Sequence, residues 1–129
     1  MISESVPRAQ DLLRGSALFR GLADRNRLAI VAVLAGGEQR VVDLTGALGL
    51  AQGTVSGHLA CLRDCGLVVG RPEGRQMFYS LTHPELMDVL AAAERLLALS
   101  GDAVELCQNY GCGVEAAGSL LDVEEGSPR

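Results

Sequence analysis

Aromatic residues and lysine are scarce in this 129-residue sequence. Two phenylalanines, two tyrosines and no tryptophan make up only 3% of the chain. We therefore expect an aliphatic core and no stacking of nucleic-acid bases on aromatic platforms. Lysine is absent, because all 11 basic residues are arginine. The sequence also has no phosphate-binding loop and no paired-carboxylate site, which argues against an enzyme.

Long hydrophobic runs are missing as well. The longest apolar stretch, residues 28–35, is far too short to span a bilayer. The first residues do not show the charged segment and apolar run of a signal peptide. We therefore expect a cytoplasmic protein with no membrane partner. In that compartment the four cysteines are expected to be metal ligands or redox thiols rather than structural disulfides.

The net charge of −5 is unevenly distributed. Residues 1–83 contain nine arginines and seven acidic residues, which gives a net charge of +2. Residues 84–129 contain two arginines and nine acidic residues, which gives a net charge of −7. The first two thirds of the chain can therefore face the phosphates of a nucleic acid, with the acidic end held elsewhere.

Hydrophobic periodicity predicts a mainly α-helical fold with a small β-hairpin. Asp24 is expected to cap the second helix, and Gly49 and Gly66 are expected to end the third and fourth. The predicted helices cover residues 11–20, 24–35, 41–48, 55–65 and a last stretch from near Pro84 to Gly101. Two strand-like runs at 67–71 and 76–81 flank a Pro/Gly turn and predict a hairpin. Together these elements predict a winged helix-turn-helix.

The predicted last helix is more apolar than one small core requires, which indicates a homodimer contact. Its apolar residues are Leu86, Met87, Leu90, Ala93, Leu96, Leu97 and Leu99. We expect residues 1–101 to form a domain that binds DNA and dimerises. Residues 102–129 are expected to form a tail that carries two cysteines and has a disordered acidic end.

The helix near the middle of the chain is the candidate for DNA recognition. Its residues Val55, Leu59 and Leu62 form a stripe that is expected to be buried. The candidates for DNA contact on the helix and the hairpin are Gln52, Thr54, Ser56, His58, Arg63, Arg71 and Arg75. Glutamine can pair with adenine, and arginine with guanine or phosphate. Alternatively, His58 is a metal ligand or is solvated, and Arg71 and Arg75 are solvated hairpin arginines.

Cys61 and Cys65 are four residues apart on the same predicted helix, so their thiols share one face. Two thiolates at this spacing can chelate a soft metal ion. Cys107 and Cys112 can complete a trigonal or tetrahedral shell. The alternatives are a redox thiol pair or simple packing for Cys61 and Cys65, and passive tail residues for Cys107 and Cys112.

Several short motifs resemble those of the ArsR/SmtB family of bacterial winged-helix repressors. The matching residues are Leu22-Ala23-Asp24, Arg27-Leu28, Val41-x-Asp43-Leu44, Leu48-Gly49-Leu50, Thr54-Val55-Ser56-x-His58-Leu59, Gly66-Leu67-Val68, Glu73-Gly74-Arg75 and Tyr79-x-Leu81. They cover about residues 17–82 in the family's order. The resemblance implies a homodimeric repressor that binds a palindromic operator and is not an enzyme.

Within the family, the cysteine pattern is similar to that of the CmtR-type cadmium/lead sensors. These sensors have Cys-x-x-x-Cys at the end of the recognition helix and a further cysteine from the partner's C-terminal region. The resemblance implies that Cys61, Cys65 and Cys107 hold Cd(II) or Pb(II), with Cys112 as a substitute or fourth ligand. Zn(II) is a further candidate. The alternatives are a redox-sensing repressor of the same fold and a thiol enzyme or metal carrier that does not bind DNA.

Overall fold

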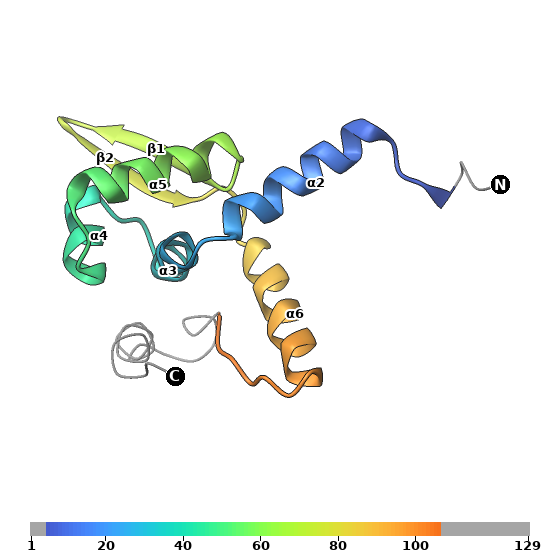
Figure 1. Ribbon diagram of the computed structural model, residues 1–129. Helices are drawn as coiled ribbons and strands as arrows, with labels where there is room; N and C mark the ends of the chain where they lie inside the picture. Colours follow the sequence, from blue (N-terminus) through green and yellow to red (C-terminus); the bar gives the residue numbers. More distant parts are fainter. Residues whose placement is uncertain (1–4, 107–129) are drawn as a thin grey trace.

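The computed structural model describes residues 5–106 and places seven elements in the predicted order (Figure 1). They are α2 (Ala9–Leu22), α3 (Arg25–Leu34), α4 (Val41–Leu48), α5 (Gln52–Asp64), β1 (Val68–Glu73), β2 (Gln76–Leu81) and α6 (Leu86–Leu99). The prediction of a winged helix-turn-helix fold, mainly α with one hairpin, is confirmed. The predicted start of the last helix near Pro84 is two residues early, because residues 83–87 first form a turn.

Local chemistry explains where the central helices begin and end. The Asp24 carboxylate caps α3 by accepting the backbone N–H groups of Asn26 at 2.8 Å and Arg27 at 3.1 Å. Gly49 ends α4 and Gly66 follows α5, both in the left-handed region at φ 69° and 79°. The three residues Gly49–Ala51 connect α4 to α5, which gives the tight helix-turn-helix predicted from the sequence.

The β-hairpin forms the wing and is joined to the loop before α4. Strands β1 and β2 pair antiparallel in a register that places Arg71 opposite Phe78. Gln39 adds an isolated bridge to β2, because its N–H donates to the Tyr79 carbonyl at 3.0 Å and its carbonyl accepts the Tyr79 N–H at 2.8 Å. These two bonds fix the base of the wing to the α3–α4 loop.

The core lies where α3, α4 and α5 meet below the wing. The predicted stripe of Val55, Leu59 and Leu62 is buried, with exposed fractions of 0%, 1% and 0%. Ile30 and Leu44 are also fully buried and pack against it. The buried stripe fixes the orientation of α5, because its opposite face must then point to solvent.

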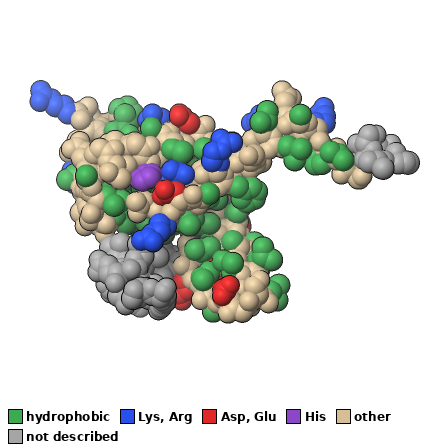
Figure 2. Space-filling model, in the orientation of Figure 1, with side chains coloured by type: hydrophobic (Ala, Val, Ile, Leu, Met, Phe, Trp, Pro, Cys, Tyr) green, Lys and Arg blue, Asp and Glu red, His purple; other side chains and the backbone are tan. Residues whose placement is uncertain are grey.

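Helices α2 and α6 project from this core and leave much of their apolar surface exposed (Figures 1 and 2). Leu12 is 53% exposed, and Leu13 is 66% exposed on α2. On α6, Leu86 and Leu90 are buried in the core, whereas Leu99 is 86% exposed. The C-terminal half of α6 therefore carries the surplus apolar surface that the sequence indicates.

The chain after α6 turns back toward the core. The backbone N–H of Leu106 donates to the Glu94 carboxylate on α6, and the Leu106 side chain packs against the core. The predicted ligands Cys107 and Cys112 lie outside the described residues, as does the rest of the predicted tail. No helix among the described residues is long and apolar enough to cross a membrane.

Candidate metal and nucleic-acid site

The N-terminal half of α5 presents a polar surface opposite its buried stripe. Gln52, Thr54 and Ser56 are all exposed, and Arg63 is exposed near the other end of the helix. Because α5 is the second helix of a helix-turn-helix, this surface has the position of a recognition helix. Four of the five predicted DNA-contact residues of this helix are therefore accessible to a ligand.

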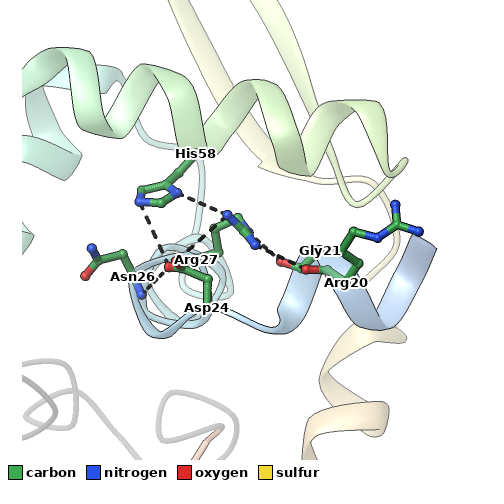
Figure 3. Close-up of polar contacts among 6 residues, drawn as sticks. All are labelled: Arg20, Gly21, Asp24, Asn26, Arg27 and His58. Carbon is green, nitrogen blue, oxygen red and sulfur yellow. Dashed lines mark hydrogen bonds and ion pairs between the residues drawn. The ribbon is translucent and has the colours of Figure 1, made fainter. Parts of the chain in front are cut away.

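His58, the fifth predicted residue, faces the protein. Its ring is 17% exposed and lies between α5 and the start of α3 (Figure 3). The Arg27 Nη1 atom is 3.4 Å from His58 Nδ1, and the Asp24 Oδ1 atom is 4.0 Å from His58 Nε2. In the sequence, Arg27 stands out only as part of a family motif, and no local pattern predicts its contact with His58.

The two predicted wing arginines lie in different environments. Arg71 donates two hydrogen bonds to the Glu38 carboxylate, at 3.0 and 2.9 Å, and one to Glu73 at 2.8 Å. The hydrogen bonds to Glu38, and to a smaller extent the one to Glu73, raise the pKa of Arg71. Arg71 in turn lowers the pKa of Glu38. Arg71 also lies 5.1 Å from the centre of the Phe78 ring. Its charge is thus already paired within the free protein.

Arg75 lies in the turn at the tip of the wing, next to Gly74 at φ 65°. It is exposed and forms no ion pair with any residue between 5 and 106. Of the two wing arginines, Arg75 is therefore the one whose guanidinium is available to a phosphate.

The cysteine pair lies at the C-terminal end of the same helix. Cys61 and Cys65 are both free, partly exposed thiols one turn apart. Burial raises the pKa of the Cys65 thiol, and the neighbouring Cys61 raises it further. The Cys65 Sγ atom lies against Gly21 of α2, so close that a Cβ atom on Gly21 would be 3.0 Å away.

Within the described part of the chain, the cysteine pair alone offers too few ligands for a metal ion. Two adjacent sulfur atoms suit a soft or borderline ion, which normally takes three or four such ligands. Between residues 5 and 106, no group of three or more His, Cys, Asp or Glu side chains is arranged to hold an ion. An ion bound by this pair would therefore need further ligands from outside residues 5–106 of the same subunit.

Comparison with known proteins identifies the same fold and function class. Residues 24–69 match the family described as bacterial regulatory protein, arsR family. The CmtR regulator of Mycobacterium tuberculosis is 42% identical over 112 residues, which cover 73% of this chain and 93% of the relative. A probable mercury resistance operon repressor of Streptomyces lividans is 36% identical over 89 residues, which cover 69% and 71%.

A solved structure agrees with these sequence matches. The NMR structure of the cadmium metal-sensor CMTR from M. tuberculosis has a TM-score of 0.54 and 40% identity, covering 64% of this chain and 85% of that chain. The family consists of DNA-binding transcriptional regulators and not of enzymes, which sets aside the thiol-enzyme alternative. This chain belongs to the arsR family of bacterial regulatory proteins.

Proposed function

We propose that the protein is a homodimeric, cytoplasmic transcriptional repressor that releases its operator DNA when it binds Cd(II) or Pb(II). Cys61 and Cys65 of one subunit would hold the ion together with Cys107 of the partner subunit. Cys112 would substitute for Cys107 or add a fourth sulfur. Zn(II) would be a weaker inducer, because sulfur-rich sites favour softer ions.

One observation carries this proposal: α5 holds both the exposed polar residues and the thiol pair. Gln52, Thr54 and Ser56 occupy its first two turns, Cys61 lies in its last turn, and Cys65 directly follows as its C-cap. An ion that pulls on the thiols acts on the same rigid element that would lie in the DNA groove. No long relay is therefore needed between the metal and the DNA.

The exposed apolar surface supports a dimer. Leu13 on α2 and Leu96 on α6 are each 66% exposed, and other leucines extend the surface on both helices. A second copy of the chain would remove this surface from water. In such a dimer the two α5 helices would enter successive major grooves of a palindromic site, about 34 Å apart.

The pKa of Cys65 argues against this thiol as the first target of an oxidant. A redox-sensing cysteine needs a low pKa, because the thiolate is the form that reacts with peroxide. Burial and Cys61 instead raise the pKa of Cys65. A soft metal ion displaces the proton directly, so metal affinity should fall as the pH is lowered.

The relatives support the same class of inducer. The M. tuberculosis structure is that of a cadmium metal-sensor, and the S. lividans relative is a probable mercury resistance repressor. Both names refer to soft, thiophilic ions. We favour cadmium and lead because the Cys-x-x-x-Cys spacing is the one that resembles the CmtR-type sensors.

The test combines a metal titration with a DNA-binding assay on the full chain. Cd(II) binding is followed by thiolate-to-metal absorption, and binding to the protein's own promoter DNA by fluorescence anisotropy. We expect Cd(II) to weaken DNA binding by about 5- to 150-fold, a typical range for allosteric coupling. C61S and C65S should still bind DNA but should lose this response.

Two results would contradict the proposal. Cd(II) could bind without any loss of DNA affinity, or C61S and C65S could respond like the wild type. Release of DNA by peroxide or a disulfide reagent in the presence of a chelator, with no effect of metal, would favour the redox-sensing repressor instead.

A further inference from the structure

Arg27 joins three helices at the junction of α2 and α3. Its Nε atom donates to the Gly21 carbonyl at 2.8 Å and its Nη2 atom to the Arg20 carbonyl at 3.1 Å, both at the C-terminal end of α2 (Figure 3). Its Nη1 atom points to His58 of α5. The Arg27 side chain is only 16% exposed, so it is part of the structure and not of the surface that meets a ligand.

The contact with Arg27 favours one tautomer of His58. A guanidinium has only donors, so His58 Nδ1 must be the acceptor in this pair. A neutral ring then carries its proton on Nε2, the nitrogen that faces the Asp24 carboxylate. The ring thus lies between Arg27 of α3 and Asp24, the residue that caps this helix.

Asp24 is suited to this arrangement. Burial disfavours the ionised carboxylate, but the pKa of Asp24 is still lowered, chiefly by the backbone N–H groups of Arg27 and Asn26 and also by the nearby Arg27 charge. The carboxylate that caps α3 therefore remains an anion beside His58 Nε2. Asp24 therefore both caps α3 and places a negative charge beside the ring of His58.

We propose that His58 is a positioning residue that fixes the DNA-reading half of α5 on the α2–α3 junction, as its Nε2–H tautomer, and does not read DNA itself. The proposal rests on the proposed function, in which α5 is the helix that binds DNA. It separates His58 from Thr54 and Ser56, whose side chains are exposed on the same helix.

The tautomer can be measured on the wild-type protein without any DNA. Long-range ¹H–¹⁵N correlation NMR separates protonated from unprotonated ring nitrogens. At a pH where the ring is neutral, we expect His58 to show an unprotonated Nδ1 and a protonated Nε2. A dominant Nδ1–H form, or equal amounts of both tautomers as in a solvated ring, would overturn the proposal.

A double-mutant cycle tests the positioning role. H58A and R27A should each weaken binding to the promoter DNA by about 10-fold, the order expected for a lost hydrogen bond to a charged group. H58A should weaken DNA binding less in the R27A background than in the wild type, because the Arg27–His58 contact is already lost there. H58Q should restore most of the affinity, since its amide can accept from Arg27 and donate toward Asp24.

S56A serves as the matched control. This residue is exposed on the same helix, so its effect should add to that of R27A. If H58A and R27A are additive instead, and R27A alone leaves DNA binding unchanged, His58 contacts DNA directly and the positioning role is wrong.

A failure of the positioning role can be distinguished from a failure of the proposed function. If the wild type binds no promoter DNA, the proposed function fails. The free energy of unfolding in urea is then measured for the same variants. The effects of H58A and R27A on it should again be non-additive. Additive effects on unfolding would overturn the positioning role. If R27A does not fold, R27K takes its place, since it keeps the charge but loses the guanidinium fork.

Discussion

The helix-turn-helix core and the two outer helices bury their apolar residues to very different extents. Leu44 and Leu62 in the core are fully buried within one chain, whereas Leu13 on α2 and Leu99 on α6 are 66% and 86% exposed. The core is therefore complete in a single subunit. The outer helices would be completed by a partner in the proposed dimer.

The thiol pair lies where these two regions meet. Cys61 belongs to α5 of the core and Cys65 caps this helix, yet the Cys65 sulfur rests against Gly21 of the outer helix α2. An ion bound here would contact both the helix proposed to read DNA and a helix proposed to form the dimer. The position is suited to a regulatory site for that reason.

The largest expected effect comes from a truncation in the core. L62A should lower the free energy of unfolding by about 2 to 5 kcal/mol, because it leaves a cavity in a fully buried site. L99A should change it by less than about 0.5 kcal/mol in the monomer. Urea unfolding at low protein concentration measures both, and equal losses would contradict the division into two regions.

A charge on an outer helix should separate the subunits. L96E places a carboxylate on the exposed apolar surface of α6, so we expect the dimer dissociation constant to rise by more than about 10-fold. V42E is the control, because Val42 is a 60% exposed apolar residue of the core region. Sedimentation equilibrium should show a monomer for L96E and a dimer for V42E; two dimers would refute the proposed interface.

A methyl group at the junction of the two regions should disturb the thiol pair. The Cβ atom of G21A would lie 3.0 Å from the Cys65 sulfur and 3.2 Å from Leu67 Cδ1. We expect G21A to lower the free energy of unfolding by about 1 to 3 kcal/mol and to weaken Cd(II) binding. G15A on the same helix meets no atom within 4 Å and should not destabilise the protein. Equal Cd(II) affinities for the two variants would show that the junction does not shape the site.

A methyl group added at Gly57, on the face of α5 proposed to contact DNA, should raise stability but weaken DNA binding. A Cβ atom on Gly57 would meet nothing within 4 Å, so G57A should stabilise the protein by about 1 kcal/mol through helix propensity. It should also weaken DNA binding, because the added methyl group faces the groove. G46A on α4 has the same free space and should stabilise without this loss. Unchanged DNA affinity in G57A would place the interface elsewhere.

The smallest effect concerns the start of α4. The Arg40 guanidinium and its backbone N–H lower the pKa of Asp43 from 3.8 to about 2. This lowered pKa stabilises the fold fully above pH 3.8, and the contribution is lost as the pH falls toward 2. Urea unfolding of D43N should therefore depend less on pH over this range than that of the wild type. D64N, which alters an exposed carboxylate on α5, should not differ from the wild type in this respect.

Local patterns in the sequence predicted most of the fold. The spacing of apolar residues gave the buried stripe of α5, and Asp24, Gly49 and Gly66 marked helix ends that the structure confirms. These signals depend on neighbours within a few residues, so they can be read without tertiary contacts. The surplus of leucines on α6 could be counted in the same way.

The environments of the site residues could not be predicted in this way. Arg71 pairs with Glu38, 33 residues away, and His58 contacts Arg27, 31 residues away. No periodicity reports such pairs, because they form only when the packed helices and the wing bring distant residues together. For the same reason, Arg71 and Arg75 look equivalent in the sequence but differ in the structure.

The most direct test of the central claim asks whether one ion is bound by two subunits. A C61S/C65S subunit keeps only its tail cysteines, and a C107S/C112S subunit keeps only those of α5, so neither homodimer should bind Cd(II) tightly. After unfolding and refolding together, about half of the dimers are mixed, and each mixed dimer holds one complete site out of two. We predict that thiolate-to-cadmium absorption reappears at about a quarter of the wild-type level. No recovery in a mixture shown to contain mixed dimers would contradict a site shared between subunits.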